Sequence, residues 1–467
     1  MTGRLQLGML CLFGWLLARS PRLFPRLLCR FVAWLIYFLL PRKRRILLRN
    51  LHAAFPDLSP PELRSLARES IRQMVSFALL AGAQPFFRPD TLKTLYHVPP
   101  ETVGILRNTL NHNQPSLVLI PHLGPQECHT ALPALLDFPV GEVGVIYRPL
   151  DARVVDQWIR KSRERFGLKL LSRKSSLPES LGLLRRNGSL VLLFDQSAGD
   201  RHGGLMTFFN QPCTGTPFVG MLANRFRPKI ILLHAQPTGF WQVRFVAREV
   251  PADLPPEHCI FHAHQELEKL LREEPALRPA WLWMHDRWKT QRDPARLFHL
   301  QAKYDWRGEE TAFAGHPPVY RPNLCLILLP EDSGLLHGVL PALFRLRDQR
   351  PDLQLIGIGQ LPPGLTQNDA PFRRILPKPG GKAAVKTLRA LAGEFPLWGI
   401  SLEPVKHWPK VFTLTKPLLT AGILAPGVRD PGLTHAWRIP PGLSPGQWLP
   451  AFLASLGDTV DPITPKV

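Results

Sequence analysis

The stretch that decides the fold runs from Leu117 to Glu127 and reads LVLIPHLGPQE. Its first four residues are apolar, which is typical of a short buried strand. Pro125 is suited to the first position of a helix, and Gly124 supplies the bend before it. The sequence therefore predicts that His122 lies at the end of a strand and that Glu127 lies in the first turn of the following helix.

Short apolar runs alternate with helical segments on both sides of this stretch. The predicted strands cover residues 117–120, 143–147, 190–194 and 230–234, and the predicted helices cover 58–84, 151–166, 176–186 and 217–226. Asp151 is suited to cap the start of the helix at 151–166, and Gly167 to end it. This alternation predicts an α/β fold with buried, partly parallel strands.

The H-x4-E spacing has a chemical interpretation of its own. In a strand–bend–helix turn, the side chains of His122 and Glu127 can meet. A carboxylate bound to one imidazole nitrogen fixes the tautomer and stabilises the imidazolium that forms when the other nitrogen takes a proton from a hydroxyl. The spacing by itself is a weak signal, because a lone histidine at a strand end is more often structural than catalytic.

The composition narrows the class of partner. The 467 residues carry 58 basic and 36 acidic side chains, a net charge of +22. This charge favours an anionic partner such as a lipid surface, an acidic carrier protein or nucleic acid. We expect no nucleic acid, because no aromatic-interleaved or zinc-finger pattern accompanies the basic residues.

The cysteines and tryptophans offer weaker candidates. The six cysteines are scattered without a C-x-x-C pair, so we expect a reducing compartment and no metal site. Cys128 follows Glu127 directly and is expected to be a buried bystander rather than a nucleophile. Trp281, Trp283 and Trp288 are expected to serve as packing or membrane-interface anchors.

The N-terminal segment combines apolar runs with positive charge. The runs 5–18 and 31–40 are each shorter than the roughly 20 residues that span a bilayer. No acidic residue precedes Asp57. This profile predicts an anchor at the surface of anionic lipid on the cytoplasmic side, with a cleaved signal peptide or buried helices as alternatives.

Several motifs follow one another along roughly residues 1–295. They are RNLHAAFPDLS at 49–59, VLIPHLGPQE at 118–127, VIYRPLD at 145–151, RERFG at 163–167, LRRNGSLVLLFDQ at 184–196, FF at 208–209 and WLWMHDRWKT at 281–290. In this order, the motifs resemble those of one bacterial family, the lipid A biosynthesis lauroyl/myristoyl acyltransferases.

The resemblance implies direct acyl transfer from a thioester on acyl carrier protein or coenzyme A, without a covalent acyl-enzyme and without a cofactor. His122 would be the general base and Glu127 its partner. Arg148 would bind the oxyanion or an acceptor phosphate, while Asp195 and Gln196 would bind acceptor hydroxyls or support Arg148. Arg163 and Arg165 would hold phosphate or acidic groups of the carrier, or simply face solvent. The acceptor would be a lipid or glycolipid at the cytoplasmic face of the bacterial inner membrane.

The last 145 or so residues go beyond the usual length of that family. Residues 323–359 read as strand, loop, helix and strand, and they resemble the opening βαβ unit of heptosyltransferase-type glycosyltransferases. That family carries Gly-Asp before the helix, whereas Gly334 is followed by Leu335, with Asp332 nearby. We expect a non-catalytic α/β domain that contacts a glycan acceptor or the partner domain, or that merely stabilises the chain.

These observations predict four segments: a membrane-associated segment at 1–48, an acyltransferase domain at 49–298, a linker at 299–320 and a smaller Rossmann-like half domain at 321–467. The expected fold of the second segment is a glycerol-phosphate-acyltransferase-like sheet flanked by helices. Two other functions stay open. One is a glycosyltransferase acting through the C-terminal segment, and the other is a catalytically silent protein that binds membrane or carrier.

Overall fold

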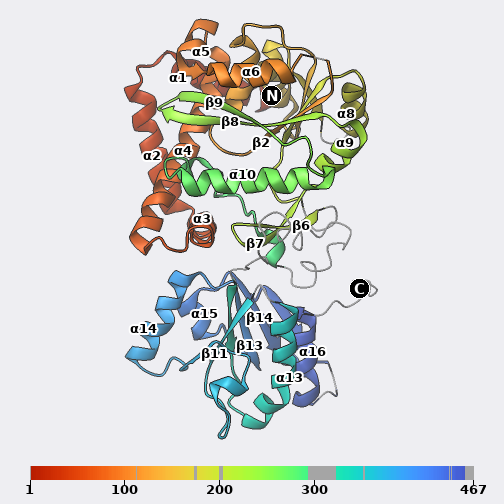
Figure 1. Ribbon diagram of the computed structural model, residues 1–467. Coiled ribbons are helices and arrows are strands. Elements are labelled where there is room, and N and C mark those ends of the chain that lie inside the picture. The colour runs from red at the N-terminus through yellow and green to blue at the C-terminus, as the bar shows by residue number, and fades with distance from the viewer. Residues whose placement is uncertain are drawn as a thin grey trace. The chain divides into compact units, whose positions relative to one another are not determined.

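The computed structural model describes residues 2–111, 113–172, 176–198, 203–292, 322–350, 353–440, 442 and 444–457. The chain divides into two compact units (Figure 1). Unit 1 comprises Met1–Leu51, Asp57–Ala198 and Gly215–Arg287, and unit 2 comprises His52–Pro56, Gly199–Thr214 and Trp288–Val467. The predicted linker at 299–320 lies outside the described residues.

Four helices open the chain: α1 (Thr2–Arg19), α2 (Leu23–Leu39), α3 (Pro41–Ala54) and α4 (Pro60–Ala83). Both α1 and α2 pack against α4 (Figure 1). Ser59 and Glu62 form a capping box that starts α4, as S-x-x-E before an apolar run predicts. A Cβ on Gly14 would lie 2.3 Å from the carbonyl oxygen of Gly82, so glycine lets α1 approach α4 closely.

The N-terminal helices differ from ordinary membrane spans. In the described part of the chain, none of the helices taken singly has both the length and the hydropathy to cross a bilayer. The pair α2 and α3 reaches both, but the chain bends by 95° between them.

The centre of unit 1 is a seven-stranded sheet in the order β1-β9-β8-β2-β5-β3-β4. Every neighbouring pair is parallel except β8 and β9, which are antiparallel. The strands are β1 (Tyr96–His97), β2 (Ser116–Ile120), β3 (Val143–Tyr147), β4 (Lys169–Ser172), β5 (Ser189–Leu193), β8 (Lys229–Gly239) and β9 (Gln242–Glu249). Because β2 is central, all of its side chains are buried, which explains its continuous apolar run.

Helices connect these strands. They are η1 (Gln84–Phe86), α5 (Pro89–Leu95), α6 (Pro100–Thr109), η2 (Gln126–Ala134), α7 (Arg153–Arg163), η3 (Glu164–Phe166), α8 (Ser176–Arg185), α9 (Phe218–Phe226), η4 (Pro256–His258), α10 (Cys259–Glu273) and η5 (Arg278–Ala280). Val118, Ile120 and Val191 face a core that α4, α6 and η2 also line. The mixed α/β fold expected from the sequence is therefore present in unit 1.

Unit 2 contains a second sheet, in the order β12-β11-β10-β13-β14-β15, with all neighbours parallel. Its strands are β10 (Asn323–Leu328), β11 (Leu353–Ile358), β12 (Arg374–Leu376), β13 (Trp398–Pro404), β14 (Leu419–Leu424) and β15 (His435–Arg438). The chain starts in the middle and winds outward in both directions, which is the order of a doubly wound nucleotide-binding fold.

The helices of unit 2 cover both faces of this sheet. They are η6 (Lys289–Arg292), α13 (Ser333–Gln349), η8 (Gln367–Asp369), α14 (Lys382–Leu391), η9 (Ala392–Glu394), α15 (Lys410–Thr415) and α16 (Pro445–Gly457). Alternate residues of β10 belong to two separate cores: Cys325 and Ile327 to one, Leu326 and Leu328 to the other. A hairpin of β6 (Gly204–Phe208) and β7 (Gln211–Gly215) forms a separate two-stranded sheet.

Most predicted elements have the expected type, and two helix starts differ. The first turn after His122 is the 3₁₀ helix η2, and Pro125 is its cap rather than its first residue. Ala152, not Asp151, caps α7. Asp156, the next acidic residue in the sequence, lies in the first turn of α7. Its carboxylate accepts a 2.8 Å hydrogen bond from the backbone N–H of Leu150 and so holds the loop before the helix.

Candidate active site

His122 stands in a tightly held loop after β2. Gly124 turns this loop with a φ of +74°, and a Cβ there would lie 1.8 Å from the carbonyl oxygen of Ala235. No other residue type therefore fits without moving β8. The backbone N–H of Leu282 donates to the carbonyl of His122 at 3.1 Å. The imidazole thus projects from a loop fixed by β8 on one side and by residues 280–282 on the other.

The partner of His122 is Asp195. The two strands β2 and β5 pair in parallel with Ile120 opposite Leu193, and the same offset two residues on sets His122 opposite Asp195. Nδ1 of His122 lies 2.6 Å from Oδ1 of Asp195, and the backbone N–H of His122 donates to Oδ2 at 2.8 Å. The register of two buried strands therefore creates a histidine–aspartate dyad.

Asp195 is buried and carries its charge through hydrogen bonds. Its side chain is 1% exposed, and Oδ2 also accepts from Nε1 of Trp281 at 2.6 Å. Burial would raise the pKa of Asp195, but the charge of His122 and the donors from His122 and Trp281 lower it to about 2. Asp195 is therefore ionised at neutral pH and holds a proton on Nδ1 of His122.

The environment of His122 raises its basicity. Burial would lower the pKa of His122, but the charge of Asp195 and the hydrogen bond to it outweigh burial, and the pKa is raised above 6.5. With Nδ1 donating to Asp195, Nε2 holds the lone pair and lies 2.9 Å from Nε2 of Gln196, whose amide donates to it. Nε2 is thus the basic atom of the site.

Glu127 does not meet His122, so the predicted pairing of these two side chains is wrong. Its carboxylate forms two hydrogen bonds with Arg163, Nε to Oε1 at 2.7 Å and Nη2 to Oε2 at 2.9 Å. Arg163, in the last turn of α7, is therefore paired with Glu127, while its side chain remains 30% exposed and lines a cavity.

The backbone around Glu127 explains this direction. The carbonyl of Glu127 accepts from Nε2 of Gln84 at 2.9 Å and from Oγ1 of Thr130 at 2.8 Å. Gln84 is itself fixed by the hydroxyl of Tyr96, which donates to Oε1 at 2.7 Å. The peptide of Glu127 is therefore tied toward η1 while Asp195 already occupies Nδ1 of His122, and the carboxylate extends to α7.

A chamber of about 370 Å³ lies beside His122. Four parts of unit 1 line it. They are α4 (Ser70, Met74, Phe77, Ala78, Ala81), the loop after β2 with the start of η2 (His122, Gly124, Pro125, Gln126, Glu127), the side chains of Arg163 and Leu193, and the segment 279–282. Asp195 is not among the lining residues and its side chain is 1% exposed, which does not favour the predicted contact with an acceptor hydroxyl. Asp195 instead supports His122 from beneath.

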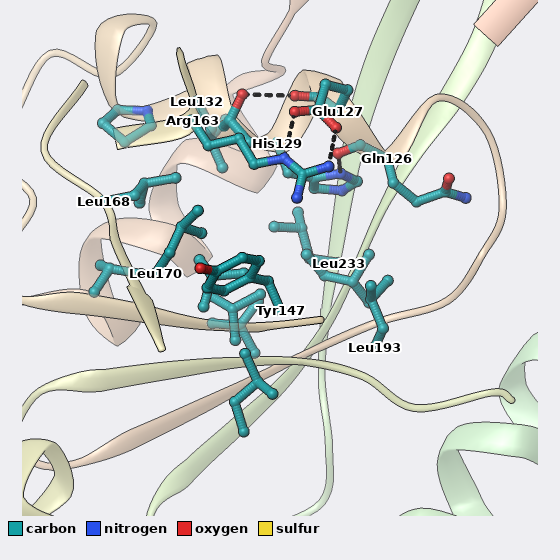
Figure 2. A pocket seen from close by; sticks show the side chains of 18 of the residues that line it. Gln126, Glu127, His129, Leu132, Tyr147, Arg163, Leu168, Leu170, Leu193 and Leu233 are labelled. Atoms are coloured by element: carbon teal, nitrogen blue, oxygen red, sulfur yellow. Dashed lines mark hydrogen bonds and ion pairs between the residues drawn. The ribbon is translucent and has the colours of Figure 1, made fainter. Parts of the chain in front are cut away.

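A second cavity, of about 230 Å³, is almost entirely apolar. Figure 2 shows the Glu127–Arg163 pair at one end of it, with apolar side chains such as Leu168, Leu170 and Leu233 spread beyond. Gln126, Glu127, Arg163 and Leu193 line both this cavity and the chamber. The Glu127–Arg163 ion pair is therefore part of the wall of both spaces.

Arg148 follows β3 and lines the apolar cavity, not the chamber of His122. Its side chain is exposed, and it forms no ion pair or hydrogen bond with any residue that the structure describes. Gln196, also exposed, touches His122 instead of Arg148. The predicted support of Arg148 by Asp195 and Gln196 is thus not formed.

Burial shifts the pKa of three other reactive side chains, those of Cys128, His129 and His264, in the direction that favours their neutral forms. The thiol of Cys128 is buried, and burial raises its pKa far above the usual range, which agrees with its predicted role as a bystander. Burial lowers the pKa of His129 to about 4 and that of His264 to about 3. Within the described residues, no group of three potential ligands could hold a metal ion.

Sequence reasoning missed the roles of Asp195 and Trp281. Asp195 was visible as an acid at the end of a predicted strand, but its neighbourhood depends on β2 and β5 being adjacent although β3 and β4 separate them in the chain. Trp281 offered no signal beyond its place in the WLWMHDRWKT motif, because its bond to Asp195 joins residues 86 positions apart.

Comparison with protein families gives an independent assignment. The family model described as bacterial lipid A biosynthesis acyltransferase matches residues 5–290, which contain both cavities and the dyad. A search of curated proteins found no significant match. The family match covers more than half of the 467 residues, and the chain therefore belongs to the bacterial lipid A biosynthesis acyltransferase family.

Proposed function

We propose that this lipid acyltransferase moves a fatty acyl chain from a thioester donor to a hydroxyl of a lipid A-type or related glycolipid acceptor. His122 is the general base, and Asp195 orients it. One observation carries the proposal: the basic Nε2 of His122 sits at a chamber that shares four lining residues with a mostly apolar cavity. A hydroxyl, a base and a place for an acyl chain are thereby brought together.

The reaction follows from this geometry. The acceptor hydroxyl takes the place of the Gln196 amide at Nε2 and gives its proton to that nitrogen as its oxygen attacks the thioester carbonyl. The tetrahedral intermediate then breaks its C–S bond, and the leaving thiolate takes the proton from the imidazolium. Asp195 stays ionised throughout and stabilises the imidazolium, because its pKa is about 2.

The two cavities divide the substrates between them. The apolar cavity takes the acyl chain, with the thioester at the Glu127–Arg163 boundary next to His122. Arg148 lines only the apolar cavity, which favours binding of a phosphate of the donor or acceptor rather than the oxyanion. We propose acyl carrier protein or acyl coenzyme A as the donor, with no cofactor.

We also propose that the protein works on the cytoplasmic face of the bacterial inner membrane. Large apolar side chains are exposed on α1 and α2: Leu5, Met9, Leu12, Phe13, Trp15, Leu16, Leu23, Phe24, Leu27, Phe31, Trp34, Phe38 and Leu39. Arginines stand between and beside them, at positions 19, 22, 26 and 30. Apolar and cationic groups together suit the interface of an anionic bilayer, where an acceptor lipid is present.

Unit 2 is proposed to be non-catalytic. A nucleotide sugar would need its phosphates at the start of α13, where the strand order reverses. Asp332 already fills that place, with Oδ1 accepting from the backbone of Gly334 at 2.8 Å and Leu335 at 3.1 Å. Because a carboxylate there repels phosphate, the observation counts against the glycosyltransferase alternative.

The test uses the full-length protein in detergent or vesicles with membrane lipid extract. Acyl carrier protein and coenzyme A, each loaded with a labelled acyl group, are supplied in separate reactions. The lipids are then analysed by mass spectrometry. The parent protein should transfer the label to lipid, and His122→Ala should lose about 10²- to 10⁴-fold. His407→Ala, an exposed histidine of unit 2, is the matched control and should be fully active. Transfer that survives in folded His122→Ala would refute the proposal.

A further inference from the structure

We propose that Trp281 is a positioning residue of the active site: its indole N–H holds Asp195 in the one orientation that serves His122. The inference rests on the proposed acyl transfer. It concerns a residue that the sequence predicted to be a packing or membrane-interface anchor. Trp281 acts on His122 through Asp195, and it is also one of the residues that line the chamber beside His122.

The carboxylate of Asp195 is bound at both oxygens. Oδ1 faces Nδ1 of His122 at 2.6 Å, and Oδ2 accepts from the backbone N–H of His122 at 2.8 Å and from Nε1 of Trp281 at 2.6 Å. Trp281 is 2% exposed and the Asp195 side chain 1%, so water does not replace a lost donor freely. Among the described residues, Trp281 is therefore the only side chain besides His122 that donates a hydrogen bond to this carboxylate.

The backbone holds Trp281 at this distance. The N–H of Gly124 donates to the carbonyl of Ala280 at 3.0 Å, and the N–H of Leu282 donates to the carbonyl of His122 at 3.1 Å. Leu123 and Trp281 form an antiparallel bridge between these two bonds. The segment that carries Trp281 is therefore paired, residue by residue, with the loop that carries His122.

Tryptophan suits this place for chemical reasons. Its indole nitrogen only donates and does not titrate, so it cannot compete with Asp195 for the proton on Nδ1. Its N–H also draws negative charge toward Oδ2. Without it, Asp195 would present more charge to His122 and would be fixed at Oδ2 by one backbone donor alone.

The test compares two tryptophans of equal burial. Trp283 is also buried, but its Nε1 donates to the carbonyl of Arg278 and not to the dyad. Trp281→Phe should lower kcat by roughly 10- to 100-fold, the scale of one hydrogen bond to a charged group, with little change in KM. Trp283→Phe should leave kcat within a few-fold, and both variants are checked for folding by circular dichroism and thermal unfolding.

A pH profile separates positioning from packing. Removal of the N–H leaves more negative charge on Asp195, which stabilises the imidazolium of His122. The acidic limb of kcat should therefore move to higher pH in Trp281→Phe and stay in place in Trp283→Phe. In addition, Trp281→Phe should cost little when added to Asp195→Asn, because both act on the same interaction.

The outcomes are distinguishable. If Trp281→Phe does not fold, Trp281→His replaces the indole by a smaller ring with an N–H and is compared with Trp281→Leu, and only the former should keep substantial activity. An unshifted acidic limb, or an unchanged factor in the Asp195→Asn background, overturns the inference while loss of activity in His122→Ala still supports the proposed function. Full activity of His122→Ala overturns the proposed function itself.

Discussion

The two sheets of this chain bring acidic residues to the same kind of place with opposite results. In unit 1, Asp195 follows β5 at the carboxyl edge of the sheet and meets His122 beside a chamber. In unit 2, Glu331 lies shortly after β10 and Glu403 lies near the end of β13, both at the carboxyl edge of the sheet. Nζ of Lys378 donates to both carboxylates, to Glu331 at 3.2 Å and to Glu403 at 3.1 Å. Parallel strands bring polar side chains to one edge of a sheet. Whether a reactive atom there is left without a partner depends on which side chains meet.

The contrast reflects which charges are already satisfied. The carboxylate of Asp195 accepts hydrogen bonds from His122 and Trp281, and Nε2 of His122 remains available as a base. Near Glu403, the ammonium group of Lys378 bridges the carboxylates of Glu331 and Glu403, and Asp332 accepts hydrogen bonds from the backbone of α13. Unit 2 therefore has the strand order of a doubly wound α/β fold, and its own side chain, Asp332, caps the helix that follows the first strand.

The largest expected effect distinguishes the two carboxylates near His122, those of Asp195 and Glu127. Asp195→Asn should lower kcat on the order of 10³-fold, because the amide neither fixes the useful tautomer of His122 nor stabilises its charged form. Glu127→Gln should cost only about tenfold, the scale of one weakened hydrogen bond to a charged group, since Glu127 acts on Arg163. Initial rates with saturating donor decide between them, and an equal or larger loss in Glu127→Gln would restore the pairing predicted from the sequence.

A pH profile gives the next largest effect. His122 works as a base only when neutral, and Asp195 raises its pKa above 6.5. Activity should therefore fall about tenfold for each pH unit below that raised pKa. In Asp195→Asn, burial no longer has an opposing charge, so the acidic limb of the residual activity should move to lower pH. A limb that moves to higher pH in this variant contradicts the assigned dyad.

Chain-length preference tests the apolar cavity. Leu136 lines it and is partly buried, so Leu136→Trp removes part of its volume. The ratio of kcat/KM for long over short acyl donors should drop several-fold, since each excluded methylene is worth about 0.8 kcal/mol of burial. Leu177→Trp, at an exposed position of α8, adds the same ring outside the cavity and should leave the ratio unchanged. Equal ratios in both variants would place the acyl chain elsewhere.

How far the sequence predicted this molecule depends on the range of the interaction. The strand before His122, the bend at Gly124 and the helix that begins near residue 58 follow from neighbouring residues, and all three were predicted correctly. Asp195 and Trp281 reach His122 across 73 and more positions, through the order and register of strands that no local pattern specifies. The H-x4-E spacing was misleading because a nearby acid in sequence is not the nearest acid in space.

The smallest expected effect concerns unit 2. Asp332→Ala removes the side chain that caps α13 and should lower the stability of this unit by about 1 kcal/mol, as loss of a helix cap commonly does. Acyl transfer should be unchanged, because the dyad and both cavities lie within unit 1. Thermal unfolding measures the first and initial rates the second, with Asp348→Ala, an exposed acid near the end of the same helix, as the control. Gain of nucleotide binding on removal of the carboxylate would show that Asp332 alone blocks the anion site, whereas a large loss of acyl transfer would show that unit 2 takes part in the reaction of unit 1.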